Sequence, residues 1–245
     1  MFLKPILLCV LYLAFFASYA LADPFKMPEK FVYDLTWTGI SAGTATLEFV
    51  NDGERMKIVS TARSADWVSV FYTVEDRVES IQTKNNPLHS RAQPVNYRMK
   101  IREGRHRKDK EVIFASDKNK AIYIDHLNNE KKEFDLPLPV FDPLSGFYQV
   151  RTLKLAVGET VYVTVFDSKK VWNVEVQVLR KEKVTLPAGT FDTIVIKPLM
   201  KSEGIFSRKG DIFIWLTDDL KHIPVKMQTK AAVGSIIATL VLGNY

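Results

Sequence analysis

From Phe31 onward the sequence alternates apolar and polar residues in one segment after another, and Gly, Asn, Asp or Pro separates the segments. Successive side chains of a β-strand point to opposite faces, so this period of two predicts antiparallel strands with one buried face. Asn51-Asp52-Gly53 is a typical hairpin turn between two of them. The alternation therefore predicts a mainly β protein, a large antiparallel curved sheet that forms either a closed barrel or a half-barrel.

One segment clearly departs from this alternation. Asp142 is a good N-cap and Pro143 suits the first position of a helix. The residues that follow at helical spacing are Leu144, Phe147, Tyr148, Arg151 and Leu155. They predict one internal amphipathic helix over about 142–155 that covers an end or a face of the sheet. A second break, at 64–72, predicts either a short helix or a bulged crossing.

Residues 1–22 have the pattern of an export signal. Lys4 precedes an apolar run from Ile6 to Ala17, and the small residues Ala20 and Ala22 suit a cleavage site before Asp23. An uncleaved membrane anchor is the alternative, since the run approaches the length of a spanning helix. We expect cleavage after Ala22, which leaves residues 23–245 as a single β-rich exported domain, soluble or peripherally attached to a membrane.

The chain has one cysteine, Cys9, which lies inside this signal segment. The processed chain would have no disulfide, no thiol nucleophile and no thiolate metal site. Its formal charge of +6 becomes +5 when the charge of Lys4 is subtracted. An exported protein does not normally meet nucleic acid, so this bias favours anionic lipid headgroups, lipopolysaccharide or acidic polysaccharide as partners. Ordinary solubility charge is the alternative explanation.

A dense basic run between Arg98 and Lys110 spans a predicted hairpin. Arg102, Arg105 and Arg107 are its candidates for contact with anionic headgroups, because guanidinium groups bind phosphate and carboxylate well. The alternative is a solvated hairpin whose charges prevent edge-to-edge pairing with other strands.

Aromatic residues form a second set of candidates. A curved sheet whose side chains do not fill its interior would leave an apolar cavity suited to an acyl chain. The aromatic residues that we expect to line such a ligand site are Trp37, Phe71, Tyr72, Phe147, Trp172 and Trp215. The alternative is that they only pack the core.

No arrangement of residues typical of an active site is visible. The four histidines are far apart in sequence and lack metal-ligand spacing. Ser145 precedes Gly146 but lacks the Gly-x-Ser-x-Gly pattern of a hydrolase, and Asp142 has a capping position. We therefore predict no catalytic residue, no metal, no cofactor and no enzymatic activity.

Four phrases together resemble an exported bacterial family, the domain-of-unknown-function family 3108. They are YDLTWTGISAGTATL, DPLSGFYQVR, LPAGTFDTIVIKP and WLTDDLKHIPVKMQTKAAVGSIIATL. The resemblance covers about Phe31 to Leu240 and implies a periplasmic β-rich protein of Gram-negative bacteria without assigned catalytic residues. The last phrase is also similar to the corresponding part of periplasmic lipoprotein carriers with half-barrel folds, a likeness of architecture only.

These observations favour a non-enzymatic, periplasmic binding module for an apolar or amphiphilic component of the cell envelope, such as a lipid or a lipoprotein acyl chain. The first alternative is an envelope assembly or interaction protein with a filled core. The second is a hydrolase that acts on envelope glycans or lipids. The sequence does not indicate an oligomeric state.

Overall fold

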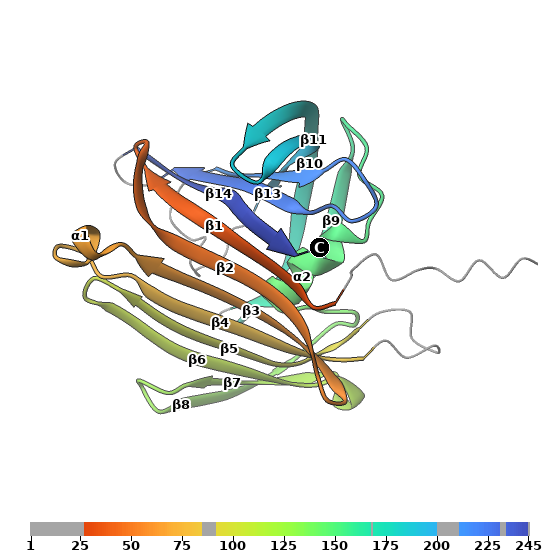
Figure 1. Cartoon of the computed structure of the whole chain (residues 1–245). Helices are drawn as coiled ribbons and strands as arrows, with labels where there is room; N and C mark the ends of the chain where they lie inside the picture. Colours follow the sequence, from red (N-terminus) through yellow and green to blue (C-terminus); the bar gives the residue numbers. More distant parts are fainter. Residues whose placement is uncertain (1–26, 85–91, 168, 200–210, 231–233, 245) are drawn as a thin grey trace, which may run out of the picture.

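The computed structural model describes residues 27–84, 92–167, 169–199, 211–230 and 234–244, so the predicted signal segment 1–22 lies outside the described residues. Within them, strands form one antiparallel, strongly curved sheet (Figure 1). The first strands are β1 (Glu29–Trp37), β2 (Ile40–Asp52), β3 (Arg55–Ser64), β4 (Glu75–Thr83), β5 (Pro94–Glu103), β6 (His106–Ala115), β7 (Lys120–Asp125) and β8 (Glu130–Asp135). The others are β9 (Thr160–Asp167), β10 (Lys170–Leu186), β11 (Gly189–Leu199), β12 (Ile212–Thr217), β13 (Pro224–Lys230) and β14 (Ser235–Asn244).

Almost every pair of neighbouring strands is also consecutive in the chain. The order across the sheet is β8-β7-β6-β5-β4-β3-β2-β1-β14-β13-β12-β11-β10-β9. The exception is the β1–β14 pair, in which Lys30 lies opposite Asn244. This pair joins two meanders into a single sheet, and it leaves β8 and β9 as the two edges. The predicted curved antiparallel sheet is therefore confirmed, and of the two forms left open, a closed barrel or a half-barrel, the described residues form the open one, because no ladder of backbone hydrogen bonds joins β8 to β9 among them.

Side chains bring the two edges together where the backbone ladder is missing. Lys169 Nζ lies 2.6 Å from Glu130 Oε2, and the ring centroids of Phe134 and Phe166 are 5.4 Å apart. Phe141, in the connection after β8, forms an isolated parallel bridge with Val165 on β9. The edge of β9 is thus partly covered by the chain that leads into the main helix.

In the described part of the chain, three helical segments interrupt the strands: α1 (Asp66–Ser69), η1 (Ser116–Lys118) and α2 (Pro143–Arg151). Asp142 caps α2 as predicted, with its carboxylate accepting hydrogen bonds from the backbone of Leu144 and Ser145. The helix ends at Arg151, four residues before the predicted end near Leu155. It ends early because Thr152 and Leu153 donate to carbonyls three residues back, which tightens the last turn.

Three clusters of buried apolar side chains, taken from the described residues, pack around α2. One contains β1–β3 residues such as Phe31 and Phe49, the second contains β9–β12 residues, and the third contains β5–β7 residues such as Tyr123. The strand β11 is buried on both faces, because Ile194 and Val195 belong to different clusters and both have no exposed surface. The fold is thus stabilised mainly by apolar burial.

Candidate functional site

Large apolar side chains are exposed at the end of the sheet where the β1–β2 hairpin, the α1 segment and the β5–β6 hairpin lie (Figure 1). We call six of them the apolar rim: Trp37 (40% exposed), Ile40 (60%), Trp67 (46%), Val70 (77%), Phe71 (84%) and Tyr72 (39%). Large apolar side chains are mostly buried in folded proteins, and several exposed ones at the same end of a sheet are typical of an interaction site.

Hydrogen bonds fix the backbone that carries the rim. Trp67 Nε1 donates to the carbonyl of Ser41 at 3.1 Å, and the backbone amide of Ala65 donates to the carbonyl of Ala42 at 2.8 Å. The hydroxyl oxygens of Ser64 and Ser69 are 2.7 Å apart. These contacts hold α1 against β2, so the exposed side chains of Val70 and Phe71 extend from an anchored segment.

The β5–β6 hairpin lies directly beside this segment. The amide of Gly104 donates to the carbonyl of Thr73 at 2.8 Å, and Val74 forms an isolated bridge with Glu103. The ring of Tyr72 covers Gly104 so closely that a Cβ atom there would lie 2.6 Å from Tyr72 Cε2. Tyr72 of the rim therefore packs on the turn of the basic hairpin.

Three exposed arginines surround that turn, and we call Arg102, Arg105 and Arg107 the basic tip. Residues 102–108 carry four basic side chains and one acidic side chain, a net charge of +3. Arg107 Nη1 donates to the carbonyls of Gly104 and His106 at 2.7 and 2.8 Å, which holds its guanidinium over the turn. Positive charge and apolar surface are thus adjacent at one end of the molecule.

Two carboxylates on β4 partly neutralise the positive charge of the basic tip. Arg102 Nη1 lies 3.2 Å from Glu75 Oε2, and both side chains are about half exposed. The backbone amide of Arg102 donates to Asp76 Oδ1 at 3.0 Å. Burial raises the pKa of Asp76 to about 6, although this hydrogen bond opposes the shift. An exposed pair such as Arg102–Glu75 is weak, so Arg102 can exchange Glu75 for another anion at little cost.

The structure separates the six predicted aromatic residues into two groups. Trp37, Phe71 and Tyr72 belong to the rim, and Tyr72 lies beside the turn that carries the three arginines predicted as a separate site. Phe147 packs against two of the apolar clusters, and Trp172 packs against the cluster of β9–β12. Trp215 is 4% exposed, donates from Nε1 to Glu182, and has Lys226 Nζ 4.4 Å from its ring centroid.

Sequence reasoning missed three members of the rim, Ile40, Trp67 and Val70. A signal for two of them was present in SADWVSVFY, at 64–72, where apolar residues occur in a segment that breaks the alternation typical of a strand. A short connection lies at the surface, so its apolar side chains have few neighbours to pack against and tend to stay exposed. Ile40 has no such signal, because it belongs to an ordinary hairpin.

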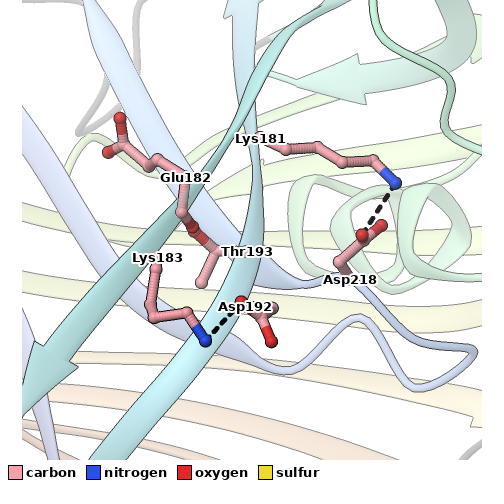
Figure 2. Close-up of a pocket in the computed structure, with 6 residues that line it drawn as sticks. All are labelled: Lys181, Glu182, Lys183, Asp192, Thr193 and Asp218. Carbon is pink, nitrogen blue, oxygen red and sulfur yellow. Dashed lines mark hydrogen bonds and ion pairs between the residues drawn. The ribbon is translucent and has the colours of Figure 1, made fainter.

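Figure 2 shows a separate pocket of about 220 Å³ along β10, β11 and the turn after β12. It is lined by Lys181, Glu182, Lys183, Asp192, Thr193 and Asp218. Its charged groups already bind one another: Lys181 Nζ is 2.7 Å from Asp218 Oδ2, and Lys183 Nζ is 2.9 Å from Asp192 Oδ1. None of the predicted site residues lines this pocket.

The polar groups that could support chemistry have structural roles. Ser145 is buried, and its hydroxyl donates to Asp142 Oδ2 at 2.7 Å within the helix cap. Within the described ranges, no three His, Cys, Asp or Glu side chains are arranged to hold a metal ion. The helices in the same ranges are all too short to cross a membrane.

The sequence matches the family model described as "Protein of unknown function (DUF3108)" over residues 32–241. No curated protein matches it. Among solved structures, a β-barrel-like protein of the domain of unknown function DUF1849 from Brucella abortus is similar, with a TM-score of 0.56 and 14% identity over 89% of this chain and 97% of that chain. At this identity the likeness supports the barrel-like fold alone.

Two further structures align with lower TM-scores. A candidate exported protein with a YmcC-like fold from Bacteroides fragilis has a TM-score of 0.34 and 10% identity over 91% of this chain and 98% of that chain. A candidate lipoprotein from Parabacteroides distasonis has a TM-score of 0.32 and 10% identity over 89% of this chain and 96% of that chain.

Proposed function

This chain belongs to the DUF3108 family of proteins of unknown function, and we propose that it is an exported, non-enzymatic binding module for an amphiphilic component of the cell envelope. The observation that carries this proposal is the apolar rim with the basic tip beside it. An amphiphile needs both an apolar surface for its hydrocarbon and a charged group for its head. The rim and the tip offer both within one end of the sheet.

The binding surface is the rim rather than the interior. The space around α2 contains packed side chains of the three clusters in the described part of the chain. Phe71 and Val70, in contrast, are more than three-quarters exposed, although their burial would be favourable. A ligand that covers them recovers this hydrophobic free energy without opening the core.

The signal pattern and the position of the cysteine support export of this chain. Residues 1–22 have the pattern of a cleavable signal, and the only cysteine lies within them. The remaining chain needs no disulfide, because its core is large enough to stabilise one domain of this length. A periplasmic location would bring the rim to lipids, lipoproteins and lipopolysaccharide.

Binding of a single-chain anionic amphiphile tests the proposal. The purified protein is titrated with lysophosphatidylglycerol, and binding is followed by isothermal calorimetry. We expect V70S/F71S to bind at least about tenfold more weakly, since two apolar contacts are lost. The matched control is L220S, because Leu220 is 87% exposed at the turn after β12. Equal affinities for wild type, V70S/F71S and L220S would overturn the proposal, as would a wild type that binds no amphiphile.

A further inference from the structure

We infer that the rim docks on the surface of an anionic phospholipid bilayer, with the side chains of Val70 and Phe71 inserted and the basic tip at the headgroups. This inference rests on the proposed function and names the partner of the same site. Three features support the inference: the residue types in the rim, the position of the arginines, and the location of the β1–β2 hairpin, the α1 segment and the β5–β6 hairpin at the same end of the sheet.

We call the two most exposed members of the rim its apex and the three members with a polar ring group its collar. Val70 and Phe71, the two most exposed members, are aliphatic or purely aromatic. Trp37, Trp67 and Tyr72, which carry a polar N–H or O–H group, are between 39% and 46% exposed. Trp and Tyr prefer the headgroup level of a bilayer, whereas Phe is stable deeper, at the acyl boundary. The order of exposure, from apex to collar, therefore matches the preference of these residue types for the layers of a membrane surface.

The arginines of the basic tip lie beside Tyr72, one member of the collar. Tyr72 packs on Gly104, and Arg102, Arg105 and Arg107 flank that glycine. Arg107 uses only Nη1 for the two carbonyls of its own turn, so the other donors of its guanidinium remain for a phosphate. Long cationic side chains commonly place their apolar stems along a membrane surface and their charges at its headgroups.

A bilayer suits this surface better than a single lipid molecule does. The rim is distributed over the β1–β2 hairpin, the α1 segment and the residues after α1, and the basic tip adds the β5–β6 hairpin. All of these segments lie at the same end of the sheet (Figure 1), so an extended surface suits them better than one small molecule does. Pockets for single small molecules usually enclose most of the ligand instead.

Co-sedimentation with large vesicles tests the inference. The vesicles contain phosphatidylcholine alone or phosphatidylcholine with phosphatidylglycerol, at low and high salt. We expect the wild type to bind the anionic vesicles preferentially, and high salt to weaken that binding. Each basic residue near an anionic surface contributes about fivefold in affinity, so R102S/R105S/R107S should bind about 100-fold more weakly. V70S/F71S should also lose binding.

The matched control removes the same charge elsewhere. K132S/K181S/K183S changes three exposed lysines on β8 and β10, each of which is paired with a carboxylate, outside the rim and the basic tip. We expect its binding to change by less than about threefold, since these lysines lie away from the docking surface. Equal losses in the control and the arginine variant, or equal binding of the wild type to both kinds of vesicle, would overturn the inference.

The two proposals can fail separately. If lysophosphatidylglycerol binding depends on Val70 and Phe71 but no vesicle binds, the bilayer inference is wrong and the amphiphile-binding function stands. If neither amphiphile nor vesicle binds, both are wrong. A crosslink from position 71 to a specific envelope protein would then identify the rim as a protein-docking surface.

Discussion

Arg151 and Glu29 form a bidentate ion pair in the interior, with Nη1–Oε2 and Nη2–Oε1 distances of 2.8 Å. Their exposed fractions are 0% and 1%. Arg151 also donates to the carbonyls of Lys221 and His222, each at 3.0 Å, and the hydroxyl of Tyr148 donates to Glu29 Oε2 at 3.1 Å. This network of hydrogen bonds connects the end of α2 with the start of β1 and with the turn before β13.

Replacing Arg151 by Met should lower the free energy of unfolding by about 3–5 kcal/mol, because it leaves the Glu29 carboxylate buried without a partner. The double variant E29M/R151M should recover part of this loss, since no charge remains buried. Urea unfolding followed by circular dichroism measures both.

The control for this prediction is Lys30→Met. It breaks the pair between Lys30 Nζ and Glu48 Oε1, which has the same 2.8 Å distance but is partly exposed on both sides. We expect a loss of less than about 1 kcal/mol there. A loss in R151M no larger than the loss in K30M would show that the buried pair does not stabilise the fold.

Asp142 links the helix to the sheet and should be sensitive to substitution. Its Oδ2 accepts from Ser80 Oγ on β4 at 2.6 Å, and its Oδ1 accepts from the amides of Leu144 and Ser145 at 2.9 and 3.0 Å. Ser80→Ala removes one of these bonds and should cost about 1–3 kcal/mol. Asp142→Ala removes all of them and should cost more. Equal unfolding midpoints for the two variants and the wild type would contradict this role.

The stability of the rim region should depend on pH through Asp76. Burial raises the pKa of Asp76 from 3.8 to about 6; the Arg102 amide opposes this shift, nearby Glu103 adds to it, and Lys108 opposes it. Between these values the folded protein binds more protons than the unfolded chain, so this group's contribution to stability falls as pH rises. We therefore compare the change in the free energy of unfolding between about pH 7 and about pH 4. On acidification this change should be more favourable to the folded state in the wild type than in D76N.

Urea unfolding of wild type and D76N at both pH values measures this difference. The comparison removes the contributions of the other titrating groups, which the two proteins share. The same pH dependence in both proteins would mean that Asp76 titrates near its ordinary pKa.

The packing of Tyr72 can be tested with two glycines of similar backbone conformation. Gly53 and Gly104 have φ angles of 60° and 57°, but a Cβ at Gly53 would meet nothing within 4 Å, whereas one at Gly104 would overlap the Tyr72 ring. G53A should cost about 1 kcal/mol, and G104A should cost more. The excess should disappear in a Tyr72→Ser background, as measured in a double-mutant cycle by urea unfolding. An excess that persists there would show that Tyr72 is not the obstacle.

The sheet and the start of the helix could be predicted because their signals are local. Alternation of apolar residues fixes which face of each strand is buried, and Asp142-Pro143 fixes where α2 begins. The end of α2 could not be predicted from Leu155, because the tightened turn at Thr152 ends the helix. The Glu29–Arg151 pair could not be predicted either, since charged residues are rarely buried and the partners meet only through tertiary packing.

The sequence predicted some members of the rim and of the basic tip, but as two separate sites. Phe71 and Tyr72 were expected to line a ligand site and Arg102 to contact headgroups, but sequence alone did not place them side by side. Their proximity depends on the contacts of Tyr72 and Thr73 with Gly104, which are long-range. Trp172 and Trp215 were expected to line the same site; Trp215 belongs to a core cluster and Trp172 packs against another.

A fluorescence measurement tests the membrane-docking claim most directly. The only cysteine, Cys9, lies in the predicted signal, so one introduced cysteine carries one environment-sensitive probe. The probe is placed at V70C on the rim or at E54C, which is exposed at the β2–β3 turn, at the opposite end of β3 from α1. With vesicles containing phosphatidylglycerol, we expect a blue shift at position 70 and none at position 54. No shift at position 70, or equal shifts at both positions, would contradict docking through the rim.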